Sequence, residues 1–136
     1  TYQSAIAYNH YRFGKYIVDN KNLKNNKITA VPDWVWSNSV VLDLPHRLNV
    51  NLYYNYTASS PLNDANTVYA KHFNLVQAKC IWKTQATKNI EVHLYIGIDN
   101  LLNEKYSLGN DINAFGGRYF NAAPTRNMYG GVKIII

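Results

Sequence analysis

Residues 89–106 read N-I-E-V-H-L-Y-I-G-I-D-N-L-L-N-E-K-Y and contain the clearest structural period of the chain. Aliphatic side chains recur at every second position from Ile90 to Ile98, with Glu91 and His93 among the residues between them. A period of two is that of a β-strand with one apolar and one polar face, whereas a helix would scatter the same aliphatic side chains around its axis. The stretch therefore predicts a strand that ends where the alternation stops.

Similar alternation elsewhere predicts an all-β fold, an antiparallel up-and-down meander of about six strands. The other strands are expected at about residues 2–18, 34–44, 47–56, 71–82 and 128–136. The two halves of 2–18 alternate in opposite registers, so we expect a β-bulge near Asn9 and His10. Pro32 precedes the second strand, where its missing N–H costs least.

The connections between these strands alternate in length. Long polar segments are expected at about 19–32, 58–70 and 103–125, and short turns at about 44–46 and 84–88. Long and short connections then lie at opposite ends of the strands, as in outer-membrane barrels, which have short periplasmic turns and longer extracellular loops. The pattern predicts an arc of a transmembrane β-barrel.

The positions of the aromatic side chains favour the same fold. Trp34, Trp36, Tyr54 and Tyr56 fall near the long-loop ends of their strands, and Trp82 falls near a short turn. Aliphatic side chains lie between, which is typical of a lipid-facing band flanked by two aromatic girdles. The alternative is a soluble all-β module that binds carbohydrate or another ligand through exposed Trp and Tyr side chains, although a soluble sandwich would place its aromatic side chains nearer mid-strand.

Six strands are too few to close a transmembrane barrel, which needs at least about eight. The two outermost strands would expose unpaired backbone N–H and C=O groups that hydrocarbon cannot satisfy. We therefore expect the chain to be either a C-terminal segment of a larger barrel or a segment that completes itself by pairing with another copy. We expect the isolated fragment to self-associate through its edge strands.

No catalytic, metal-binding or cofactor-binding site is indicated by the sequence. The single cysteine, Cys80, excludes an internal disulfide. The four histidines are far apart in the sequence and lack the spacing of a metal site. No serine, cysteine or lysine has a recognisable activating partner, so we expect no enzyme.

Basic side chains in the expected loops are the candidates for binding. The formal charge is +6, and Lys24, Arg118 and Arg126 lie in or beside polar loops. These three residues are candidates for contacting an anionic ligand or lipopolysaccharide phosphates; the alternative is that they belong to ordinary solvated loops. Nucleic acid is not an expected partner, because no aromatic platform is interleaved with the loop lysines.

Three short words, in order along the chain, resemble words of one protein family. Asn100–Tyr106, N-L-L-N-E-K-Y, resembles the N-L-F-D-K-x-Y word that closes the penultimate barrel strand of TonB-dependent outer-membrane receptors. Residues 124–134 resemble the P-G-R-x-x-x-x-G-L-x-Y approach to the last strand, with Thr125 in place of the glycine and Ile136 where these proteins end in Phe or Trp. Residues 28–32 resemble the x-L-x-x-V-P segment before an earlier strand.

The resemblance implies that residues 1–136 are the C-terminal part of such a receptor's β-barrel, without the plug and the earlier strands. The implied function is uptake of a scarce ligand, such as a ferric siderophore, cobalamin or a glycan, across the outer membrane of a Gram-negative bacterium. The implied partners are outer-membrane lipid and lipopolysaccharide, the small ligand, and TonB, which would act through the absent N-terminal part. Among the loops, 103–125 is the best candidate for ligand contact.

Overall fold

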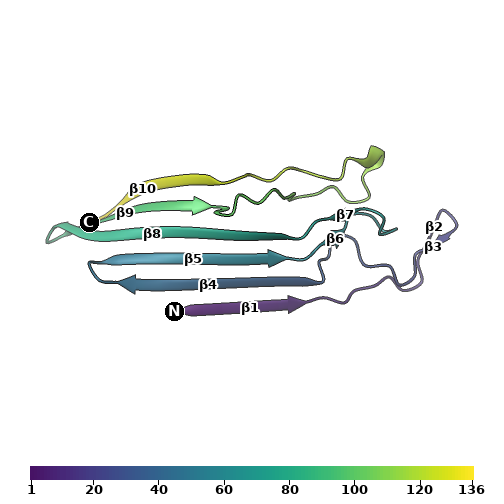
Figure 1. Ribbon diagram of the computed structural model, residues 1–136, viewed down its shortest axis with the longest axis horizontal. Coiled ribbons are helices and arrows are strands. Elements are labelled where there is room, and N and C mark those ends of the chain that lie inside the picture. The colour runs from purple at the N-terminus through teal and green to yellow at the C-terminus, as the bar shows by residue number, and fades with distance from the viewer.

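The chain forms a single six-stranded antiparallel sheet in the computed structural model, which describes all 136 residues. The strands are β1 (Tyr2–Tyr8), β4 (Trp34–Leu44), β5 (Leu48–Thr57), β8 (Phe73–Thr87), β9 (Ile90–Asp99) and β10 (Asn127–Ile135). They lie side by side in the order β1-β4-β5-β8-β9-β10, and the sheet is open because β1 and β10 do not pair (Figure 1). The predicted all-β meander of six strands is confirmed.

Long and short connections lie at opposite ends of the sheet, as predicted (Figure 1). The long connections, named here loop 1 (residues 9–33), loop 2 (58–72) and loop 3 (100–126), extend beyond the same end, while the turns 45–47 and 88–89 lie at the other. Short elements within the loops are β2 (Ile17–Val18) paired with β3 (Lys21–Asn22), β6 (Ser60–Pro61) paired with β7 (Tyr69–Ala70), and the 3₁₀ turn η1 (Phe115–Gly117). No helix is long and apolar enough to cross a membrane.

The first strand is shorter than the alternation indicated, and the predicted bulge near Asn9 is wrong. β1 ends at Tyr8, opposite Trp34, the first residue of β4. Beyond Tyr8 the pairing is irregular: Arg12 forms an isolated bridge with Lys27, and the Phe13 N–H donates to the Asn26 carbonyl oxygen. The β2–β3 hairpin forms instead around Asp19 and Asn20, whose φ angles of 47° and 60° are left-handed. Loop 1 therefore begins ten residues earlier than expected, at residue 9 rather than 19.

At the other end of the sheet, β8 is longer than predicted. It continues to Thr87, with a register shift between Gln85 and Thr87. The turn between β8 and β9 therefore contains only residues 88 and 89.

The register places the alternating apolar side chains of all six strands on one face, named here the apolar face. Directly paired residues of an antiparallel sheet point to the same side. One row crosses the whole sheet through Tyr2, Val40, Leu52, Ala78, Ile98 and Met128. Rows on either side bring together the remaining aliphatic and aromatic residues that the sequence assigned to this face, including Leu42 with Val50 and Leu44 with Leu48.

The apolar face is not covered by another layer of the chain. Ile96, Val132 and Met128 are 61%, 60% and 73% exposed, although they lie on the apolar face. Only five residues of the chain are buried, and three of them, Pro61, Leu62 and Ala70, lie in loop 2. The sheet therefore has no hydrophobic core of its own.

Aromatic side chains lie near both ends of the apolar face, as expected. Near the long loops, the ring centroids of Tyr8 and Trp34 are 4.4 Å apart, and Trp36 meets Tyr54 edge-on at 5.8 Å. At the short-turn end, the indole N–H of Trp82 donates to the carbonyl oxygen of His46 at 3.2 Å. Indole and phenol rings suit this arrangement because one part of each is apolar and the other can hydrogen-bond.

Candidate functional site

The second face of the sheet carries polar side chains that bond to one another, and is named here the polar face. On it, Asn49 Nδ2 donates to Asp43 Oδ1 at 2.7 Å, and Asn51 Nδ2 donates to Asn49 Oδ1 at 2.7 Å. The Lys79 ammonium lies 4.6 Å from the centre of the Tyr95 ring. These groups require water or another polar surface beside them, because burying unpaired polar groups in an apolar medium is costly.

Two glycines on the polar face lie beneath tyrosine rings. Gly97 pairs with Tyr129, and Gly131 pairs with Tyr95. A Cβ at Gly97 would lie 2.3 Å from Tyr129 Cζ, and a Cβ at Gly131 would lie 2.4 Å from the Tyr95 hydroxyl oxygen. The absence of a side chain at each glycine therefore lets the ring of the paired tyrosine lie against the backbone.

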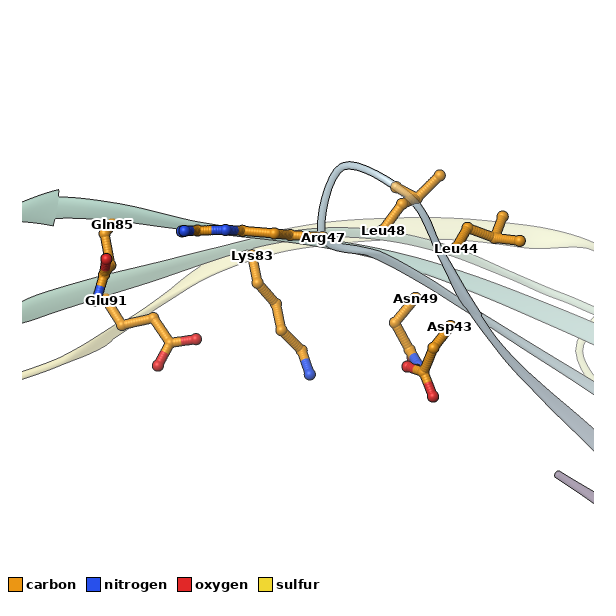
Figure 2. A pocket seen from close by; sticks show the side chains of 8 residues that line it. All are labelled: Asp43, Leu44, Arg47, Leu48, Asn49, Lys83, Gln85 and Glu91. Atoms are coloured by element: carbon orange, nitrogen blue, oxygen red, sulfur yellow. The ribbon is translucent and has the colours of Figure 1, made fainter.

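A cavity of about 400 Å³ lies at the short-turn end of the sheet (Figure 2). In Figure 2, Lys83 lies between Glu91 on one side and Asp43 with Asn49 on the other. Arg47 also lines the cavity, so two cationic side chains are matched by two carboxylates. This balance of charge gives the cavity no clear preference for an anion or a cation.

The polar residues of β9 form a pair and not a metal cluster. His93 Nε2 lies 2.7 Å from Glu91 Oε1. Asp99 is at the other end of β9, where it pairs with Asn127. No group of three or more side chains suited to a metal ion is present.

The three long loops meet at Asp64 in loop 2. Its carboxylate accepts hydrogen bonds from the Thr29 hydroxyl at 2.5 Å and from the Tyr16 hydroxyl at 3.0 Å, both in loop 1. Its backbone N–H donates to Asn113 Oδ1 of loop 3 at 2.9 Å. Asp64 therefore links all three loops, although the sequence assigned it only to a polar turn.

Backbone hydrogen bonds reinforce these links between the loops. The Ala30 N–H of loop 1 donates to Pro61 O, and the Asn113 N–H of loop 3 donates to Leu62 O, each at 2.8 Å. Asn66 of loop 2 bonds both the N–H of Lys27, at 2.6 Å, and its carbonyl oxygen, at 2.9 Å. Loop 2 is therefore the central element of the loop assembly.

Hydrogen bonding shifts the pKa values at this junction. The Thr29 hydroxyl, followed by the Asn113 side chain and the Tyr16 hydroxyl, stabilises the ionised carboxylate and lowers the pKa of Asp64. The hydrogen bond that Tyr16 donates to the Asp64 carboxylate also raises the pKa of the Tyr16 hydroxyl. At neutral pH, Asp64 is therefore ionised and Tyr16 is its neutral donor.

The three predicted binding residues, Lys24, Arg118 and Arg126, are all exposed. No hydrogen bond or ion pair joins any of them to another. Lys24 follows β3, Arg118 follows η1 and Arg126 precedes β10. Neither of the two ion pairs and none of the side-chain hydrogen bonds involves the charged group of Lys24, Arg118 or Arg126. Their contact with ligand or lipopolysaccharide stays a prediction.

Comparison with known proteins was made at the levels of sequence and structure. No protein-family model matches the chain, and no curated protein sequence matches it. Among solved structures, the siderophore receptor PiuA from Acinetobacter baumannii matches 90% of this chain with a TM-score of 0.67 and 19% identity. The ferric citrate transporter FecA matches 83% of the chain with a TM-score of 0.70 and 17% identity.

The fold resembles a segment of a TonB-dependent receptor barrel. BauA, the ferric preacinetobactin receptor from Acinetobacter baumannii, matches in the same way, with a TM-score of 0.64 and 16% identity over 83% of the chain. This chain spans 17% of the PiuA chain, 18% of FecA and 16% of BauA. The family resemblance predicted from the three words is thus confirmed at the level of the fold, and these similar structures are receptors and a transporter, not enzymes.

Proposed function

We propose that this chain is a wall segment of an outer-membrane transporter that takes up a scarce ligand with energy delivered by TonB. The observation that supports the proposal most directly is the continuous apolar face, which is exposed across all six strands of a fold shared with siderophore receptors. In a bilayer, this face would contact acyl chains, and every paired strand would have its backbone groups satisfied by its neighbours.

The two faces of the sheet fit the two sides of a barrel wall. The polar face, with its amide network and lysines, would line the lumen, and the three joined loops would stand at the outer mouth. A soluble carbohydrate-binding module would instead leave the apolar face in water, where patches of this extent are unusual. No contact in the structure favours that alternative.

We infer that a ferric chelate is the ligand, ahead of cobalamin or a glycan. The similar structures are named as receptors or transporters for a siderophore, ferric citrate and ferric preacinetobactin. TonB would act through another part of the receptor, because residues 1–136 contain only wall and loops. Lys24, Arg118 and Arg126 are proposed to meet lipopolysaccharide or ligand from exposed loop positions.

The test is uptake of radioactive iron by cells that lack the gene, compared with the same cells complemented with it. Complementation is expected to restore uptake of a ferric siderophore, and removal of TonB or of the proton gradient is expected to abolish it. The protein is expected in the outer-membrane fraction. Cobalamin uptake restored in place of iron uptake would correct the ligand class, and recovery of the protein in the soluble fraction would overturn the wall assignment.

A further inference from the structure

The turn at the tip of loop 2, named here the tip turn (residues 63–66), is bonded to both of the other long loops. Asp64 Oδ1 accepts from the Thr29 hydroxyl of loop 1 at 2.5 Å, while the Asp64 N–H donates to Asn113 Oδ1 of loop 3 at 2.9 Å. We propose that the tip turn couples loop 1 to loop 3, so that loosening of either loop loosens the other. The inference goes beyond the proposed function and does not depend on a ligand or on transport.

Loop 1 and loop 3 share no hydrogen bond, ion pair or aromatic contact with each other. Both bond instead to loop 2, at residues that are neighbours in the sequence. The Pro61 carbonyl oxygen accepts from the Ala30 N–H of loop 1. The next carbonyl oxygen, that of Leu62, accepts from the Asn113 N–H of loop 3. Outside the sheet, loop 2 is therefore the hydrogen-bonded route between the two loops.

The base of loop 2 is held by burial, whereas its tip turn is not. At the base, Leu62 is buried and its N–H donates to the Val68 carbonyl oxygen at 2.8 Å, beside the paired strands β6 and β7. At the tip, none of residues 63–66 is buried, and the turn is closed by the Asn66 N–H, which donates to the Asn63 carbonyl oxygen at 2.9 Å. The position of the tip turn therefore depends on the hydrogen bonds that loops 1 and 3 provide.

Asp64 is the point at which the two sets of bonds affect each other. Its carboxylate bonds to loop 1 and its N–H bonds to loop 3, so both are made only while its backbone and its side chain keep one conformation. Loss of the bond to Asn113 frees the backbone, and the carboxylate then has more positions away from the Thr29 and Tyr16 hydroxyls. Loss of the bonds from loop 1 frees the carboxylate and weakens the bond to Asn113, because a coupling between two sites acts in both directions.

Native-state hydrogen exchange of the purified full-length protein in detergent tests the proposal, because exchange protection measures local opening. Thr29→Val removes the hydroxyl of loop 1, and its effect is read at the Asn113 amide of loop 3. Asn113→Gly removes the acceptor of loop 3 and tolerates the left-handed φ of 48°, and its effect is read at the Ala30 amide of loop 1. One such hydrogen bond changes protection about fivefold in its own loop, so protection in the opposite loop is expected to fall about twofold to threefold.

Matched variants separate coupling from a general loosening of the loops. Ala114→Gly adds the same backbone freedom beside Asn113 but leaves the Asn113 side chain in place, and it is expected to leave loop 1 unchanged. In loop 1, Tyr16→Phe removes a hydroxyl that donates to Asp64, whereas Tyr11→Phe removes an exposed hydroxyl that makes no hydrogen bond. Only Tyr16→Phe is expected to lower protection at the Asn113 amide. The β5 amides should not change in any variant, because all the altered side chains lie in the loops.

The proposal is overturned if each variant changes protection only in its own loop. It is also overturned if Ala114→Gly or Tyr11→Phe changes the opposite loop as much as Asn113→Gly or Thr29→Val does. Failure of this inference is distinguishable from failure of the proposed function. Iron uptake together with independent loops would reject the coupling alone, and coupled loops without iron uptake would reject the transport proposal alone.

Discussion

The six-stranded sheet and the three long loops use their apolar and polar side chains in opposite ways. On the sheet, large aliphatic side chains such as Ile96 and Val132 are 61% and 60% exposed. In loop 2, Leu62 is only 1% exposed, although the loops are rich in polar residues. The sheet depends on its surroundings to cover its apolar face, whereas the loop assembly satisfies its own side chains through contacts such as those of Asp64.

This contrast shows that the sheet exposes large apolar side chains, whereas loop 2 buries Leu62. In a soluble protein, a face as apolar as that of β9 and β10 would be buried against a second layer. In the proposed barrel wall, lipid would take the place of that second layer, and the loops, which would stand in water, are held together by hydrogen bonds. The following substitutions test whether the two regions respond separately.

Ile96→Lys is expected to have the largest effect, and only in a bilayer. Ile96 lies on the apolar face of β9, in a row with Cys80 and Gly130. A lysine at the bilayer midplane of a barrel costs about 2–4 kcal/mol of folding free energy. The measurement is urea unfolding of the full-length protein in phospholipid vesicles.

The control for Ile96→Lys is Gln77→Lys, which places the same charge on the polar face, opposite Tyr53. It is expected to leave the free energy of unfolding nearly unchanged. If both lysine variants lost the same stability, or if neither lost any, the assignment of the lipid-facing and lumen-facing sides would be wrong.

Asp64→Ala is expected to loosen the loops and leave the sheet intact. It removes the acceptor for the Thr29 and Tyr16 hydroxyls, and loss of the bond from Thr29 alone is expected to cost about 1 kcal/mol. Hydrogen exchange at the Ala30 and Asn113 amides, which join the loops to loop 2, measures the effect. Slower-exchanging amides of β5, in the middle of the sheet, should not change.

Asp111→Ala is the matched control, because Asp111 is an exposed loop carboxylate whose side chain accepts no hydrogen bond in the structure. Exchange at Ala30 and Asn113 should be the same in this variant as in the unaltered protein. Equal loosening by Asp64→Ala and Asp111→Ala would show that Asp64 has no special part in joining the loops.

The sequence predicted the sheet well because alternation is a local property. The aliphatic residues from Ile90 to Ile98 alternate without interruption, and β9 spans Ile90–Asp99. The same kind of local pattern was misleading near Tyr11 and Phe13, because β4 begins only at Trp34 and the residues beyond Tyr8 pair only irregularly, with the returning part of loop 1.

The loop junction was out of reach of such reasoning. Asp64 receives its hydrogen bonds from residues that lie 35 and 48 positions away in the sequence. The composition around Asn63 and Asp64 indicates only a turn. Which distant hydroxyl meets the carboxylate depends on how the three loops pack, and the sequence contains no periodic signal for that packing.

Gly97→Ala is expected to disturb the polar face of the sheet by about 1 kcal/mol, because the new methyl group would displace the Tyr129 ring. The ring can swing away at its free end, which keeps the cost low. Urea unfolding in vesicles measures the loss, and the Gly97→Ala/Tyr129→Ala double variant should lose less than the sum of the two single variants. Gly14→Ala, in loop 1, is the control because a Cβ there meets nothing within 4 Å; equal losses at Gly97 and Gly14 would contradict the close ring contact.

Acid is expected to have the smallest effect, and it should act on the loops before the sheet. Because the folded protein lowers the pKa of Asp64, the unfolded loop binds a proton more readily. The stabilisation is therefore complete above the ordinary aspartate pKa of about 3.9 and is lost as the pH falls through the lowered value. Tyr16 has the opposite dependence: its pKa is raised, so its contribution is present below about pH 10 and is lost only as the pH rises through the raised value. Exchange protection at Ala30 and Asn113, corrected for intrinsic rates, should fall between pH 6 and pH 3, and Asp64→Ala should abolish this dependence. A fall of the same size in Asp64→Ala would assign the acid sensitivity to another group and would remove Asp64 from the explanation of how the loops are held together.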